Sequence, residues 1–373
     1  MARPVISRYS LNPPLKKGRR FAFSVLEGAL VGILSLFCFM IAGFFDPSIP
    51  LYASPSKEAF SLSTDIAALV LESGAGESDG QSGLLSYASR AEKFLKGSTR
   101  ASLSAHGHEI SGLYYAGVEE YSDKADRAYY YLVSYKPGHV DGFDDFSFSG
   151  KSAYLSYFSS GFFEEGGGYP LLQENVALSL DEYFRQPSYL PGKTNADVLT
   201  KAYESLCADV SKDLQAHSLS YRSLFASYET CRDAIYRFKI GEAFLCHLLS
   251  CLLYFFALSY LVKEKQTLGR RILHCPLIKN DGTLVPWHGK LLRSLLLCLE
   301  TSLIPSFLPF LYYGGGAVDL FVRSLIGPFS LLAFFLASLI LVLLDYFGCF
   351  YLKHQSSLSE FLFKAKSVDG REE

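Results

Sequence analysis

The sequence predicts an all-α membrane protein, with four transmembrane helices and a mostly α-helical extracytoplasmic domain inserted between helices 1 and 2. The first observation is hydropathy: in a chain of 373 residues that is 49% hydrophobic, four stretches are long, apolar and nearly uncharged. Each is close to the roughly 20 residues that a helix needs to cross a bilayer core of about 30 Å. The predicted transmembrane helices cover 21–45, 241–262, 291–313 and 325–350.

The second observation is the distribution of charge, which predicts the orientation. The block 46–240 carries 17 Lys and Arg against 26 Asp and Glu, whereas the rest of the chain carries 18 against 11. Lys and Arg collect on the cytoplasmic side of membranes, in short segments near the spans. We therefore expect the basic tail 1–20, the basic loop 263–290 and the tail 351–373 in the cytoplasm. Four crossings of the cell membrane then place both termini inside, the acidic domain outside and a short outer loop at 314–324.

The first apolar stretch has two interpretations. A basic head followed by an apolar run also describes a cleaved signal peptide. The run here is about 25 residues, longer than the usual signal core of 7–15 residues, and it contains Glu27. These features favour an uncleaved membrane anchor.

Proline, glycine and helical periodicity divide the block 46–240 into predicted helices and loops. The helices are expected from Pro55 to about Gly74, over 84–95, over 122–135 and over 171–184, with loops and short strands over 137–169. Thr194 and Asp197 have the spacing of a capping box. A last helix from about 220 to 262 would be about 60 Å long and would connect the outer domain to the second span.

Two of the eight cysteines, Cys207 and Cys231, fall in the predicted outer domain. They lie equally far in sequence from residue 219. If the chain turns there into a helical hairpin, the two thiols meet and form a disulfide. The alternative is one long helix with two cysteines on its apolar face.

The loop 263–290 carries a family resemblance. It contains the segment TLGRR, a short extended run, the turn signal NDG and two basic residues that lead into the next span. This order resembles the RDD family of membrane proteins, whose hallmark between two spans is T-x-G-[KR]-[RK], a D-G turn and a basic residue opening the next helix. The family also has an Arg and an Asp seven residues apart in its first helix and an Asp in its C-terminal tail. The matching positions of the loop and tail are Thr267, Gly269, Arg270, Arg271, Asp281, Gly282 and Glu360.

The chain departs from the family pattern in two respects. Glu27, seven residues after Arg20, and Glu360 stand where the family has Asp. The family also has a short link between its first two spans, where this chain has nearly 200 residues, so the resemblance covers about 20–45 and 243–369 only. The family's molecular role is poorly defined, and the resemblance implies topology and a suspected transport role.

Ionisable residues inside the predicted spans define a candidate site. A charge at the bilayer centre costs at least about 2.5–3.5 kcal/mol, so such groups face protein or water. The candidate intramembrane polar site consists of Arg20, Glu27, Arg293, Glu300 and Asp345. The functional interpretation is cation binding or proton relay. The alternative, which we favour because most of these groups lie near a membrane edge, is that the acids pair with Arg20 and Arg293 and fix helix packing.

Other chemistry is not indicated by the sequence. His106, His108 and Glu109 form a weak metal pattern, and no enzyme motif, cofactor motif or metal site is predicted. The acidic outer domain argues against nucleic-acid binding. We therefore expect a non-enzymatic RDD-like membrane protein that moves a small ion or solute. Its expected partners are membrane lipids and further copies of the chain in a homo-oligomer. The second hypothesis is a structural or sensory envelope component whose outer domain binds an envelope protein partner.

Overall fold

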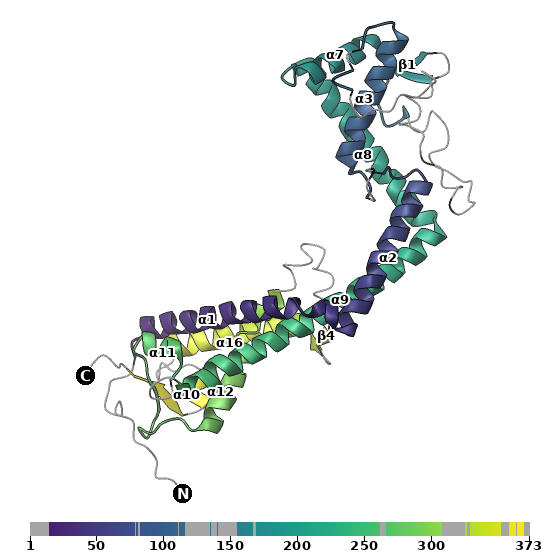
Figure 1. Cartoon of the computed structure of the whole chain (residues 1–373). Helices are drawn as coiled ribbons and strands as arrows, with labels where there is room; N and C mark the ends of the chain where they lie inside the picture. The colour runs from purple at the N-terminus through teal and green to yellow at the C-terminus, as the bar shows by residue number, and fades with distance from the viewer. Residues whose placement is uncertain are drawn as a thin grey trace. The chain divides into compact units, whose positions relative to one another are not determined.

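The computed structural model describes residues 15–78, 80, 83–110, 112–115, 135, 140, 155–166, 169–261, 266–307, 325–326, 329–351, 358–362 and 364–368. The described residues are mostly helical (Figure 1). Most of the helix predicted at 122–135, most of the loops predicted at 137–169 and the whole outer loop at 314–324 lie outside them.

The chain divides into two compact units. Unit 1 consists of Met1–Lys57 and Cys231–Glu373, and unit 2 of Glu58–Thr230. Unit 2 lies within the acidic block 46–240, but unit 1 includes residues from both ends of that block.

A buried ion cluster explains why both ends of the block belong to unit 1. Lys239 is 1% exposed and donates hydrogen bonds to Asp46 and to Glu242, the latter at 2.8 Å. The Lys239 ammonium also lies 5.4 Å from the centre of the Tyr52 ring. A buried ammonium needs such partners because its desolvation is costly. These contacts hold residues 46–57 and 231–240 in the same unit.

Unit 1 is built from helices of unequal length (Figure 1). They are α1 (Lys17–Gly43), the short 3-10 helix η1 (Asp46–Ser48), α9 (Leu219–Cys251, in this unit from Cys231), the π-helical segment η2 (Leu252–Ala257), α10 (Leu258–Leu261), α11 (Leu268–Ile272), α12 (Trp287–Glu300), α13 (Leu303–Phe307), α16 (Leu331–Phe350) and α17 (Leu358–Leu362). Helices α1 and α12 both pack against α16, and α12 also packs against η2. The helix predicted over 220–262 is confirmed, because 219–261 are helical throughout, with π geometry at η2.

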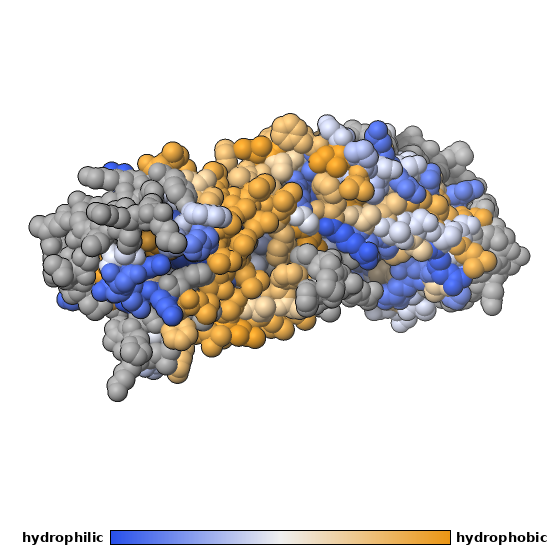
Figure 2. Space-filling view, turned by 90° about the horizontal axis from the view of Figure 1, so that it is seen from below, coloured by the Kyte–Doolittle hydropathy of each residue, from blue (hydrophilic) through white to orange (hydrophobic). Residues whose placement is uncertain are grey.

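Three helices are long and apolar enough to cross a membrane, namely Gly18–Gly43, Leu219–Ala257 and Leu331–Gly348. Large apolar side chains on these helices are exposed: Ile33 by 67%, Leu245 by 56% and Leu343 by 57%. Figure 2 shows a broad hydrophobic area on one face of the molecule. Such a surface is unfavourable in water and matches the hydrocarbon core of a bilayer.

The other apolar stretch, predicted as a helix over 291–313, is interrupted within its described part. Helix α12 ends at Glu300 after 14 residues, 301–302 form a turn, and α13 is a short helix that contains Pro305. At about 1.5 Å per residue, α12 is about 21 Å long, less than a bilayer core. The last predicted span also starts later than expected, at Leu331, because β4 (Leu325–Ile326) and β5 (Phe329–Ser330) form a short antiparallel ladder before it.

Strand β3 (Leu277–Lys279) of the loop pairs antiparallel with β6 (Ala365–Ser367) of the C-terminal tail. The turn predicted from NDG also forms, because the Gly282 amide donates to the Lys279 carbonyl at 2.9 Å and Gly282 adopts a φ of 80°, which favours glycine. Leu15 donates its amide to the Ser367 carbonyl at 3.0 Å. The N-terminal segment, the loop and the tail therefore meet in one small layer.

Unit 2 is a helical domain with one short hairpin. Its elements are α2 (Pro50–Glu72, in this unit from Glu58), α3 (Tyr87–Ala105), β1 (Phe163–Gly166), β2 (Tyr169–Leu172), α7 (Glu174–Arg185) and α8 (Leu190–His217), which α9 follows after Ser218. Helices α3, α7 and α8 pack together, and the ring of Phe94 stacks on Tyr203 with centroids 4.4 Å apart. The strands β1 and β2 are antiparallel.

Several local predictions in unit 2 need correction. The helix predicted over 84–95 is α3, which continues through the buried Gly97. The residues 171–172 belong to β2, so the helix predicted over 171–184 starts later, as α7. The capping box at Thr194 is wrong: the helix begins at Leu190, with Pro191 in its first turn, and the Thr194 hydroxyl donates to the Leu190 carbonyl inside the helix at 3.0 Å.

Candidate functional site

Glu27 lies at the centre of a buried polar cluster in unit 1. Its residue is 4% exposed, and its carboxylate accepts a hydrogen bond from the Thr267 hydroxyl. The Arg293 Nη2 lies 4.0 Å from the second carboxylate oxygen. The three residues come from α1, the loop before α11, and α12, so the contacts join segments that are far apart in sequence.

A second pair involves the C-terminal tail. The Arg20 Nη1 lies 3.2 Å from Glu360 Oε2, and both side chains are buried. Ser367 of β6 donates its hydroxyl to the other oxygen of Glu360 and accepts a hydrogen bond from Arg270 Nη1 at 2.8 Å. Arg270 also covers the ring of Phe23, 4.3 Å from its centre. The family-like residues Arg20, Arg270 and Glu360 are thus linked through one serine.

The structure gives the partners of the two arginines. Arg20 and Glu27 are seven residues apart, as are Arg293 and Glu300, so each spacing places an arginine and an acid on one helix face. The contacts run between segments: Arg20 contacts Glu360 and Glu27 contacts Arg293. The arginines therefore join different helices, and this arrangement fixes the positions of α1, α12 and the tail.

The electrostatic environment of Arg270 reflects its burial. Loss of solvent and the nearby charge of Arg293 lower the pKa of Arg270 to about 10, while Glu27 and Glu360 act in the opposite direction. Arg270 therefore stays charged at neutral pH, and the neighbouring carboxylates compensate its charge.

The cluster borders an acidic cavity of about 60 Å³. Its described ionisable lining consists of four acids and three arginines: Glu27, Glu300, Asp345, Glu360, Arg20, Arg270 and Arg293. Glu300 interacts electrostatically with both Asp345 and Arg293. The cavity brings together all five residues of the predicted intramembrane polar site.

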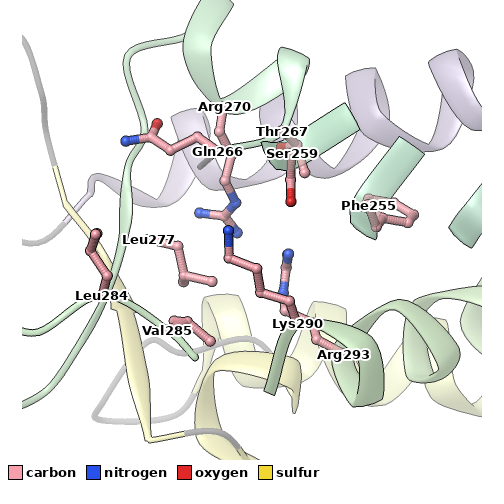
Figure 3. Close-up of a pocket in the computed structure, with 10 residues that line it drawn as sticks. All are labelled: Phe255, Ser259, Gln266, Thr267, Arg270, Leu277, Leu284, Val285, Lys290 and Arg293. Carbon is pink, nitrogen blue, oxygen red and sulfur yellow. The ribbon is translucent and has the colours of Figure 1, made fainter. Parts of the chain in front are cut away.

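A smaller basic pocket of about 30 Å³ lies beside this cavity, and both are lined by Phe255, Arg270 and Arg293. Figure 3 shows Arg270, Lys290 and Arg293 pointing toward one another from α11 and α12. The described lining of the pocket contains these three basic residues and no acid. Arg270 and Arg293 therefore border an acidic space and a basic space at once.

Comparison with known proteins leaves the family open. No family model, curated protein or solved structure matches the chain. The assignment of a role to the cavity therefore depends on its own residues.

The family-like loop residues fall into two groups. Thr267, Gly269 and Arg270 are buried at the cluster, and the Gly269 amide donates to the Tyr254 hydroxyl at 3.0 Å. Arg271 is exposed, and Asp281 and Gly282 form the β3 turn. At that turn, a hydrogen bond from the Thr283 hydroxyl and another from its amide lower the pKa of Asp281. This second group shapes the loop and does not line either cavity.

Sequence analysis missed three contributors to the cavity and cluster. Ser367 and Tyr254 bind motif residues, and Thr301 lines the acidic cavity. Hydroxyl residues are common in every segment of this chain, so only the fold distinguishes these three. The signal available for Ser367 was its place in the tail segment that resembles the family ending.

The remaining predicted features lie elsewhere. Cys207 and Cys231 are both buried, one in unit 2 and one at the start of the second segment of unit 1, and the disulfide stays a prediction. His106 lies 3.2 Å from Glu164 and His108 lies 2.9 Å from Glu174, so these histidines face different acids. Among the described residues, a group with the spacing of metal ligands does occur in unit 1: His247, Cys251 and Cys298.

Proposed function

We propose that the chain is an RDD-like, non-enzymatic membrane protein that binds a small cation or a proton at the acidic cavity and moves it across the cell membrane. The observation that carries this proposal is the charge of the cavity. Its described lining has four carboxylates and three guanidinium groups. One carboxylate therefore exceeds the available arginines, and in a low-dielectric site the excess charge favours a bound cation or proton.

The position of the excess charge supports the same conclusion. Arg293 is close to Glu27, and Arg20 to Glu360, while Glu300 interacts electrostatically with both Arg293 and Asp345, and negative charges on Glu300 and Asp345 repel each other. Two carboxylates that repel each other away from water are stabilised when a proton or a metal cation lies between them. We place the bound ion at Glu300 and Asp345.

The size of the cavity selects the class of substrate. A cavity needs at least about 10–15 Å³ to hold one water molecule, so about 60 Å³ holds only a few. This space suits a proton chain or one partly hydrated inorganic ion. It excludes the larger solutes that the sequence alone left open, unless the helices separate.

The end of helix α12 at Glu300 also supports cation binding. The C-terminus of a helix carries a partial negative charge, and transporters use the ends of broken helices to coordinate cations. Helix α12 ends at Glu300, and the next residue, Thr301, also lines the cavity. The negative helix end and the Glu300 carboxylate therefore reinforce each other.

A four-span topology is part of the proposal. The contact between Leu15 and Ser367 places the segments before the first and after the last apolar helix together, which supports an even number of crossings. Three helices are long enough to cross. We therefore assign the fourth crossing to the segment that contains α12 and α13, with a helix break in the membrane where it lines the cavity.

Flux measurements on the full chain in proteoliposomes test the function. We expect the wild type to move H⁺, Na⁺ or K⁺ down an imposed gradient, read with ion-sensitive dyes inside the vesicles. Glu300→Gln combined with Asp345→Asn should reduce the flux at least about tenfold, because each buried charge contributes 1.4 kcal/mol or more to ion binding. The control Glu242→Gln removes a carboxylate that contacts Lys239 and does not line the cavity. Its flux should match the wild type; absence of flux from the wild type, or equal flux from all three proteins, would contradict the proposal.

A further inference from the structure

A cluster of soft ligands lies in unit 1 beside the end of the acidic cavity. His247 and Cys251 occupy successive turns of α9, and Cys298 lies on α12. One ligand atom from each residue lies within 4.8 Å of the other two. His247 and Cys251 are 1% and 0% exposed, and Cys298 is partly buried.

The spacing of these atoms matches a metal centre. Zn–S and Zn–N bonds of about 2.3 and 2.0 Å in a tetrahedral site place neighbouring ligand atoms about 3.5–3.8 Å apart. The His247 Nε2 and the Cys251 Sγ are 3.6 Å apart, and the Thr301 Oγ1 lies 3.0 Å from that nitrogen and 3.9 Å from that sulfur. Three strong ligands, with Cys298 within 4.8 Å of the other two, and one hydroxyl oxygen are thus gathered in one place.

The hydrogen bonds around His247 orient the imidazole for binding a cation. The Ser35 hydroxyl donates to the Val31 carbonyl at 2.8 Å, so its oxygen accepts from the imidazole Nδ1 at 2.9 Å. A hydroxyl has one proton, and a neutral imidazole has one N–H. In this arrangement Nδ1 carries the proton, and Nε2 presents its lone pair to the cysteines. This outer hydrogen bond is typical of histidines that bind metals.

The hydroxyl proton of Thr301 does not point toward the His247 Nε2. The Thr301 hydroxyl donates to the Leu297 carbonyl at 2.6 Å, so its oxygen meets the His247 Nε2 lone pair at 3.0 Å. Two acceptors at this distance repel each other, and either a bound cation or the proton of the Cys251 thiol, whose sulfur lies 3.6 Å from Nε2, relieves this repulsion. The competing arrangement, in which Ser35 turns its proton to Nδ1 and Nε2–H donates to Thr301, needs no metal.

Both helices depart from regular geometry at this cluster. The π-helical segment η2 starts directly after Cys251, and α12 ends two residues after Cys298. Single π-helical turns occur frequently at functional sites because they re-orient side chains. The start of η2 and the end of α12 therefore lie beside the ligands that come from the two different helices.

We propose that His247, Cys251 and Cys298 bind one Zn²⁺ ion, with Thr301 at the fourth position. Two thiolates and one Zn²⁺ sum to zero charge when both thiols lose their protons on binding, which suits a site inside a membrane bundle. A monovalent ion would leave a buried negative charge. The site is distinct from the carboxylates of the proposed ion path and does not depend on the proposed function.

Cobalt provides the probe, because Co²⁺ in a site with thiolate ligands gives a thiolate-to-cobalt absorption. We expect the reduced full chain in detergent to bind one Co²⁺ per chain with this absorption, and Zn²⁺ to displace it. Cys251→Ser and Cys298→Ser should each lower Zn²⁺ affinity by about 100-fold or more, and Ser35→Ala, which removes only the outer hydrogen bond, by about 10–100-fold.

Two controls separate this site from other ligands. Cys246→Ser removes a buried thiol next to His247 that is not part of the cluster, and the double variant His106→Ala/His108→Ala removes two partly exposed histidines of unit 2. Both should keep the wild-type absorption. If a cysteine variant fails to fold, two measurements still test the proposed site: the Zn²⁺ affinity of Ser35→Ala and the metal content of the purified wild type.

Three results would overturn the proposal. They are a reduced wild type that shows no cobalt–thiolate absorption, an absorption that survives the loss of both Cys251 and Cys298, and a protein in which these two cysteines are joined as a disulfide without bound metal.

Discussion

At the scale of single residues, Gly269 shows how closely α11 approaches α1. A Cβ at this position would lie 3.0 Å from the Glu27 Cγ and 3.1 Å from the Tyr254 hydroxyl oxygen. Contacts this short force neighbouring atoms to move. Here those neighbours are a buried carboxylate and a phenol that already binds the Gly269 amide. Close packing against Glu27 and Tyr254 therefore explains why glycine stands at this family-like position.

The substitution Gly269→Ala should destabilise the protein by about 1–3 kcal/mol, the usual cost of overpacking a tight interior. The extra methyl group pushes Glu27 away from Thr267 and weakens the polar cluster. Unfolding of the detergent-solubilised chain, followed by circular dichroism, measures the effect.

Gly241→Ala is the matched control. Gly241 lies in α9 of the same unit, and a Cβ there would meet no heavy atom within 4 Å. Alanine should leave the stability unchanged or raise it by about 0.5–1 kcal/mol, because glycine is unfavourable inside helices. If both substitutions have the same effect, close packing at Gly269 is not the reason for its glycine.

At the scale of elements, the C-terminal tail is fixed to the bundle by a strand and an ion pair. β6 pairs with β3, and Glu360 of α17 contacts Arg20 of α1 at 3.2 Å. Breaking a buried pair by removing one partner leaves an uncompensated charge, which is costly, whereas removing both partners is much less so.

We expect Arg20→Gln and Glu360→Gln each to destabilise the chain by about 3–5 kcal/mol. The double variant should lose clearly less than the sum of the two, because neither charge is left alone. A double-mutant cycle by unfolding in detergent measures this coupling. Additive losses would show that the two side chains do not interact energetically.

The same elements show what the sequence can predict. The turn predicted at 280–282 is confirmed. Its signal is local, because the residues that favour the turn are the residues that form it. The pairing of β3 with β6 has no local signal, since its two strands are separated by more than eighty residues of chain. Sequence spacing likewise places Arg20 with Glu27 and Arg293 with Glu300 on one helix face each, but it does not predict the contacts between segments that join Arg20 to Glu360 and Glu27 to Arg293.

Hydropathy found the apolar stretches and misjudged where their helices break. The average over 291–313 does not distinguish a continuous helix from α12 and α13 separated by a turn. The five residues of the predicted polar site could be selected from the sequence because charged residues stand out in apolar segments, and the structure places all five at one cavity. The cluster of His247, Cys251 and Cys298 was not found, because its ligands come from two helices and cysteine is ordinary in an apolar stretch.

At the scale of the whole molecule, the contacts among terminal segments and the loop constrain the topology. Leu15 contacts Ser367, and β3 of the loop contacts β6 of the tail. A lipid bilayer cannot separate segments that hydrogen-bond to one another. In the proposed topology these three segments therefore lie on one side of the membrane, and the excess of Lys and Arg near them predicts that this side is the cytoplasm.

Labelling of introduced cysteines tests the topology in cells. Leu113 of unit 2 is 84% exposed and Ile272 of the loop region is 55% exposed, so cysteine at either position is accessible to a reagent on its own side. With a membrane-impermeant maleimide, we expect Leu113→Cys to react in intact cells and Ile272→Cys to react only after the membrane is opened. The parent chain, whose described cysteines are buried or partly buried, gives the background. Reaction of Ile272→Cys in intact cells, or protection of Leu113→Cys there, would contradict an outer unit 2 and a cytoplasmic loop, because an impermeant reagent reaches only the outer surface.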